Sequence, residues 1–60
     1  MWSTIEGQLG DRVEVATGRG SVYVNAGDDD DNTTAMLSAR AARSLAGRLR
    51  EAADALDAEP

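Results

Sequence analysis

Hydrophobic and polar residues alternate along two short runs near the middle of the chain. Residues 12–17 read RVEVAT and residues 21–26 read SVYVNA, so valine recurs at every second position. Such alternation of β-branched residues is typical of strands with one buried face. The GRG segment between the runs offers glycines, which can adopt the positive φ angles of tight turns. The pattern predicts a β-hairpin over residues 12–26, whose valine face needs a covering element.

After residue 38 the pattern changes to a helical period. Alanine, leucine, arginine and glutamate dominate residues 39–58, and all four favour helices. Apolar residues recur at steps of three and four, at Ala42, Leu45, Leu49, Ala52 and Leu56. This spacing draws one apolar stripe along about 28 Å of helix. We therefore predict an amphipathic helix over residues 38–58.

Two further segments each fit more than one structure. Residues 33–37, TTAML, form either a third strand followed by an N-cap at Ser38, or the first turn of the helix; the threonine pair favours the strand. Residues 1–11 fit both a short helix and an edge strand. The predicted fold is α+β: one domain in which an antiparallel hairpin, with two or three short strands, packs against one long C-terminal helix.

The chain is short for an independent fold. Sixty residues bury only about 60% of the surface of the unfolded chain, so small domains usually need disulfides, a metal or oligomerisation. The chain has no cysteine and no histidine, which excludes disulfides and the usual zinc sites. Self-association is the remaining way to stabilise so short a chain, although a well-packed monomer is also compatible with the sequence.

The charges of the predicted helix are arranged against its dipole. Arg40 and Arg43 lie in the first turns, whereas Asp54, Asp57 and Glu59 lie in the last. An antiparallel homodimer would place the basic half of each helix beside the acidic half of the other. We expect its interface to contain the apolar stripe together with Arg43 and Asp54, with a two-fold axis near Gly47. Alternatively, the helix arginines neutralise acidic residues of their own chain.

The acidity of the chain is concentrated in one segment. Its net charge is −5, and Asp28, Asp29, Asp30 and Asp31 in the predicted loop 27–32 account for most of it. A calcium-binding loop that starts at Asp28 would need glycine at position 33 and glutamate at position 39. The chain has Thr33 and Ala39 there, so the sequence predicts no metal site. The run is either a solvated turn or an acidic surface that attracts a basic partner. Trp2 is similarly either a lid of the core or an exposed anchor for a partner.

A leucine–serine pair followed by a periodic helix marks a resemblance to known proteins. The residues that carry it are Leu37-Ser38, Ala42-Arg43, Leu45-Ala46, Leu49, Ala52-Ala53 and Leu56. After the paired V-x-V runs, this pattern resembles small proteins of unassigned function in actinobacteria and actinophages. The absence of lysine and the abundance of alanine also suit a GC-rich genome. The resemblance implies a strand–strand–helix fold and no particular activity; those proteins often carry Pro-Glu-Gln where this chain has Ala39-Arg40-Ala41.

Composition separates the classes of function. The hydroxyl groups of the chain have no histidine or lysine to act as a base, and so short a chain offers little cleft in which the pKa of a carboxylate would rise, so we expect no enzyme and no cofactor. Its apolar stretches are too short to span a bilayer, and a cytoplasmic location is expected. An arginine edge of Arg12, Arg19, Arg40 and Arg43 could contact nucleic acid, but the acidic net charge argues against this. A homodimeric protein-interaction module, binding a host or self-encoded protein, fits best.

Overall fold

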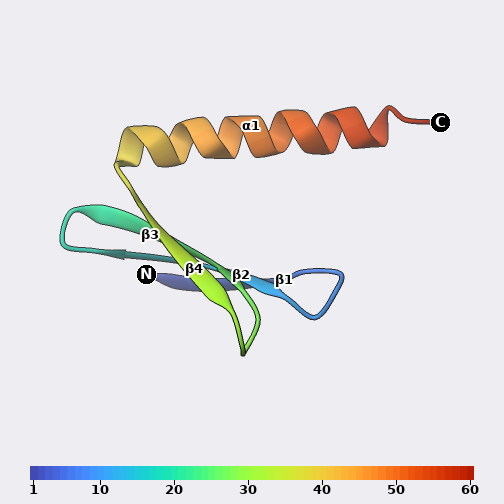
Figure 1. Ribbon diagram of the computed structural model, residues 1–60. Coiled ribbons are helices and arrows are strands. Elements are labelled where there is room, and N and C mark those ends of the chain that lie inside the picture. Colours follow the sequence, from blue (N-terminus) through green and yellow to red (C-terminus); the bar gives the residue numbers. More distant parts are fainter.

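The computed structural model describes residues 1–60 and contains one four-stranded sheet and one helix (Figure 1). The elements in chain order are β1 (Trp2–Glu6), β2 (Arg12–Gly18), β3 (Ser21–Gly27), β4 (Asn32–Leu37) and α1 (Ala39–Asp57). Each strand pairs antiparallel with the next, so the sheet order is β1-β2-β3-β4. The α+β class is confirmed, but the sheet has four strands instead of the two or three predicted.

The additional strand comes from the N-terminal segment. β1 pairs with β2 from Trp2↔Ala16 to Glu6↔Arg12 and forms one edge of the sheet. Its five residues are too few to distinguish a strand period from a helical one. The extended structure is decided by hydrogen bonding to the hairpin, whose β2 edge would otherwise be unpaired.

The β2–β3 turn uses a different residue from the one expected. Gly18 pairs with Ser21, and the two residues between them, Arg19 and Gly20, have φ angles of 50° and 78°. Two consecutive positive φ angles are typical of the type I′ turn that matches the twist of a hairpin. Gly20 behaves as predicted, whereas the second positive φ belongs to Arg19 and not to Gly18. Left-handed backbone at a non-glycine residue costs about 1 kcal/mol.

The segment before the helix follows the strand alternative. Residues 33–37 belong to β4, and the Ser38 Oγ accepts a hydrogen bond from the Ala41 amide at 3.1 Å, which makes Ser38 the N-cap. α1 then continues without interruption through Gly47. The predicted helix, 38–58, is one residue longer at each end.

The helix lies on one side of the sheet but does not close onto it (Figure 1). α1 approaches β3 and β4 only, and no residue of the chain is fully buried. The radius of gyration is 13.0 Å, compared with about 10 Å for a compact domain of this length. The predicted packing of helix on hairpin is therefore present only near the start of α1, and one chain has no closed core.

Candidate interaction surfaces

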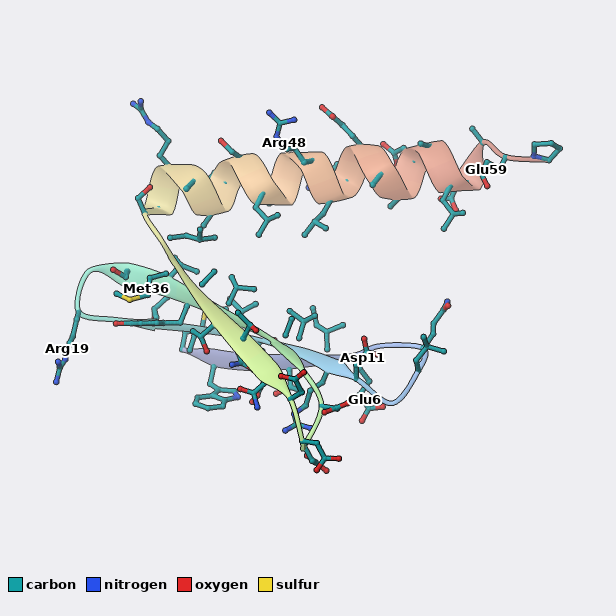
Figure 2. All side chains as sticks on the ribbon, viewed as in Figure 1. Glu6, Asp11, Arg19, Met36, Arg48 and Glu59 are labelled. Atoms are coloured by element: carbon teal, nitrogen blue, oxygen red, sulfur yellow. The ribbon has the colours of Figure 1, made fainter.

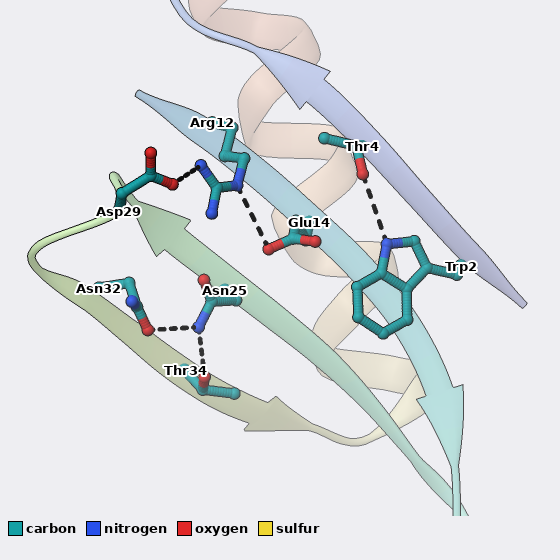
Figure 3. Close-up of polar contacts among 8 residues, drawn as sticks. All are labelled: Trp2, Thr4, Arg12, Glu14, Asn25, Asp29, Asn32 and Thr34. Carbon is teal, nitrogen blue, oxygen red and sulfur yellow. Dashed lines mark hydrogen bonds and ion pairs between the residues drawn. The ribbon is translucent and has the colours of Figure 1, made fainter. Parts of the chain in front are cut away.

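The strand register divides the sheet into two chemically different faces. The inner face is the one that carries the side chain of Val15, together with every second residue of β2 and the residues paired with them on the other strands. It carries no charged side chain, and its apolar members are Met1, Ile5, Val13, Val15, Val22, Val24, Ala26, Ala35 and Leu37. We call outer the opposite face. Figure 3 shows Trp2, Glu14 and Asn25 of the outer face in front of the sheet, with α1 behind it, so the inner face is turned toward the helix.

The predicted helix stripe is present and mostly uncovered. Because successive residues rotate by about 100°, Ala42, Leu45, Leu49, Ala52 and Leu56 lie along one side of α1. Ala42 is half-buried near the sheet and Leu45 is 37% exposed, but Leu49 is 61% exposed. Figure 2 shows Arg48 directed away from the sheet. The apolar stripe thus becomes more exposed along α1, away from the Ser38 cap.

The charged residues predicted at the dimer interface lie on another part of the helix surface. Arg43 and Asp54 are roughly 150° around α1 from the centre of the leucine stripe. Between the stripe and these charges lies a line of small residues, Ala46 and Ala53. A helix–helix contact through the leucine stripe alone could not include Arg43 and Asp54. A contact through Ala46 and Ala53 would place these two charged residues at its edge.

The helix arginines have no acidic partner within the chain. The ion pairs are those of Arg12, with Asp29 at 2.9 Å and Glu14 at 3.6 Å. Arg40, Arg43, Arg48 and Arg50 form none, so neither the acidic loop nor the helix itself neutralises them. The first turn of α1 has no acidic residue and the last has no basic one. The unfavourable charge order predicted for the helix therefore remains uncompensated in a single chain.

The outer face carries most of the side-chain hydrogen bonds of the sheet (Figure 3). The Asn25 side-chain amide donates to Thr34 Oγ1 at 2.6 Å and to Asn32 Oδ1 at 3.2 Å. Arg12 bridges Glu14 and Asp29, and the hydrogen bond with Asp29 raises the pKa of its guanidinium. A cross-strand pair such as Asn25 with Thr34 stabilises a solvated face by a few tenths of a kcal/mol. These polar groups of the outer face thus find their partners within their own chain.

One band of the outer face is apolar. The strand pairing aligns one residue from each strand across the whole sheet, in the order Trp2, Ala16, Tyr23 and Met36. Trp2 is 72% exposed and Met36 is 65% exposed. The interpretation of Trp2 as a core lid is therefore wrong for this structure, because the residue lies on the face away from α1. Tyr23 and Met36 were not predicted here, since only the register brings them into line with Trp2.

The aspartate run forms the β3–β4 turn. The Asp28 amide donates to the Asp31 carbonyl, and Asp28 Oδ1 accepts from the amides of Asp30 and Asp31 at 2.9 and 2.8 Å. These two hydrogen bonds, chiefly that from Asp31, lower the pKa of Asp28. Asp29 is paired with Arg12. Two of the four carboxylates thus have partners, one within the turn and one on β2. No group of three acidic residues is arranged to hold a metal ion.

The arginines proposed as a basic edge are not brought together. Arg12 and Arg19 lie at opposite ends of β2, and Arg12 is held by two carboxylates. Arg19 does lie near the helix start, since it lines one shallow hollow with Ala39. No continuous arginine edge of the four residues forms in a single chain.

Comparison with known proteins leaves the chain without assigned relatives. A scan against protein-family models and searches of curated proteins and of solved structures find no match. The resemblance to small actinobacterial and actinophage proteins therefore stays a prediction. No helix of the chain has the length and apolarity required to cross a membrane.

Proposed function

We propose that this chain is a small acidic protein-interaction module that forms a homodimer through its inner side and binds a host or self-encoded protein in the cytoplasm. The composition and the resemblance support an origin in an actinobacterium or its phage. One observation carries the proposal: no residue is buried, although the chain has both an apolar helix stripe and an apolar sheet face that is turned toward the helix.

The exposed surface supports self-association. A compact monomer of 6.3 kDa exposes about 3700 Å², whereas this chain exposes 5178 Å². Burial of apolar surface is the main favourable contribution to folding, worth about 25 cal/mol per Å². A chain that leaves its valines and leucines in water lacks this contribution. Association with a second apolar surface supplies it.

The helix charges support an antiparallel arrangement. Arg43 in the first half of α1 and Asp54 in the second half have no partners in their own chain. Two helices that run in opposite directions bring each arginine beside the other chain's aspartate. A two-fold axis repeats the pair, as an interface of identical patches requires.

The outer face supports binding of a different protein. Self-association through the inner side leaves the apolar band of Trp2, Tyr23 and Met36 in solvent. Tryptophan, tyrosine and methionine are enriched in the cores of protein interfaces. We propose that this band receives an apolar segment of the partner protein, and that the free carboxylates of Asp30 and Asp31 favour a partner with a basic surface.

Sedimentation equilibrium at low and at high salt tests the self-association. We expect a dimer that high salt weakens, because exposed charge pairs are screened. A monomer at micromolar concentrations under both conditions would contradict the proposal. A dimer that is indifferent to salt would retain the apolar interface and remove the charge pairing from it.

The emission of Trp2 tests which face is used, because it is the only tryptophan of the chain. If the inner side forms the dimer, the emission stays at the wavelength of a solvated indole while dilution dissociates the dimer. A shift to shorter wavelength on self-association would place Trp2 in the homodimer interface and leave no free band for a second protein.

A further inference from the structure

We propose that the helix of a second copy of this chain lies on the β1–β2 half of the inner face, antiparallel to the chain's own α1. Each sheet is then covered by two helices, one from each copy. This inference rests on the proposed self-association and specifies its geometry.

The widths of the elements point to two helices per sheet. Four strands spaced about 4.8 Å apart make a sheet about 19 Å wide. A helix with its side chains is about 10 Å in diameter, so one helix covers roughly half of this width. α1 approaches β3 and β4 and makes no contact with β1 or β2. The uncovered half of the sheet is as wide as one further helix.

The chemistry of the uncovered half selects an apolar occupant. Ile5, Val13 and Val15 are inner-face residues of β1 and β2, and Ile5 is 61% exposed. The inner face has no charged side chain that could bind a charged or strongly polar segment. The leucine stripe of α1 is apolar, uncharged and equally uncovered at Leu49 and Leu56. The leucine stripe of a second copy is therefore complementary to the uncovered half of the sheet, and it is present wherever the chain itself is present.

The helix surface is suited to both contacts. The leucine stripe can face a sheet, while the line formed by Ala46 and Ala53 lies next to it around the helix and can face a neighbouring helix. Small residues allow two helices to approach closely. In the antiparallel direction, Arg43 of one copy and Asp54 of the other then border the alanine contact. The charge order of α1, unfavourable in a single chain, becomes favourable between two.

The area to be buried fits a stable homodimer. Two separate chains of 5178 Å² each expose about 10,400 Å², whereas a compact particle of their combined mass exposes about 6200 Å². Closing the two chains into one compact particle therefore buries about 4200 Å² in total, within and between the chains. Obligate homodimers bury roughly 2000–5000 Å².

Crosslinking between two single-cysteine variants tests the geometry. The chain has no cysteine of its own, so Ile5→Cys and Leu49→Cys chains carry one thiol each. One variant is isotopically labelled, the two are mixed, and a short bismaleimide is added, so that mass spectrometry identifies the mixed product. The matched control replaces Ile5→Cys by Thr4→Cys, which places the thiol one residue away on the outer face.

We expect the Ile5–Leu49 mixture to yield the mixed crosslinked product several-fold more efficiently than the Thr4–Leu49 mixture. Equal yields from the two mixtures, in samples that sediment as dimers, would overturn the helix placement and leave the proposed self-association intact. Absence of a dimer in sedimentation would overturn both. Circular dichroism of each variant checks that the cysteine has not changed the fold.

Discussion

The two faces of the sheet are built by the same strands, but a single chain pairs the main polar groups of the outer face and leaves the inner face uncovered. On the outer face, Asn25 hydrogen-bonds to residues of β4, and Arg12 bridges two carboxylates. The inner face has one side-chain hydrogen bond, from the Met1 ammonium to Thr17 Oγ1 at 3.4 Å, and apart from Ser3, Thr17 and Thr33 its residues are apolar. Polar groups can be satisfied by neighbours and water, whereas apolar groups require a second layer. The inner face therefore indicates where another chain is needed.

The comparison predicts opposite outcomes for substitutions one residue apart on β1. Ile5 lies on the inner face and Thr4 on the outer face, and both are exposed in one chain. In the homodimer, Ile5→Asp loses about 2 kcal/mol of burial in each copy, which weakens association by about a thousandfold. Thr4→Asp leaves association nearly unchanged. Analytical ultracentrifugation over a dilution series measures both, and equal effects of the two variants would contradict an inner-face dimer.

Reversing single charges on α1 tests whether the inner side pairs two helices in antiparallel directions. Arg43→Asp and Asp54→Arg each create like-charge contacts in an antiparallel homodimer, and each is expected to weaken it about tenfold, because two pairs are affected at up to about 1 kcal/mol each. A mixture of the two variants restores opposite charges in the heterodimer. Native mass spectrometry of the mixture should therefore show mostly heterodimer. A statistical distribution of species would show that these side chains do not meet.

The β2–β3 turn allows sheet stability to be changed without altering either face. Arg19 has a left-handed φ of 50° before Gly20, and asparagine tolerates this conformation better than arginine. Arg19→Asn should raise the free energy of unfolding by about 1 kcal/mol. Urea denaturation at one fixed protein concentration measures the change. Arg19→Ala removes the same charge without relieving the backbone, so an equal gain there would attribute the effect to charge instead.

Acid titration gives the smallest expected effect and concerns the turn beside the outer face. Amide hydrogen bonds lower the pKa of Asp28 in the folded chain below its ordinary value of 3.8. Its contribution to stability is therefore fully present above that value and is lost as the pH falls through the lower folded pKa. Carboxyl NMR should give an Asp28 midpoint below 3.8. Asp28→Asn keeps the oxygen acceptor without this titration, and a wild-type midpoint at or above 3.8 would contradict the hydrogen-bonded turn.

Local features of the fold were predictable where a short segment carries its own signal. The valine alternation identified β2 and β3, and Ser38 before the helical period was the favoured one of two possible starts for α1. The missing predictions concern pairing. β1 has too little pattern of its own, and Arg19 takes the left-handed position because the hairpin register places it there. The candidate surfaces follow the same rule: the leucine stripe was visible in the sequence, whereas the line of Trp2, Tyr23 and Met36 depends on the alignment of four strands.

The sequence by itself determined β2, β3 and most of α1, because alternation, helical spacing and capping act over a few residues. It also determined that the helix charges oppose the dipole. Only the tertiary structure decided that Ile5 and Val13 share a face turned toward the helix, that Trp2 points away from it, and that α1 reaches β3 and β4 but not β1 and β2. These relations join residues far apart in the chain, and strand register and helix placement fix them through pairing and excluded volume, which no local pattern records.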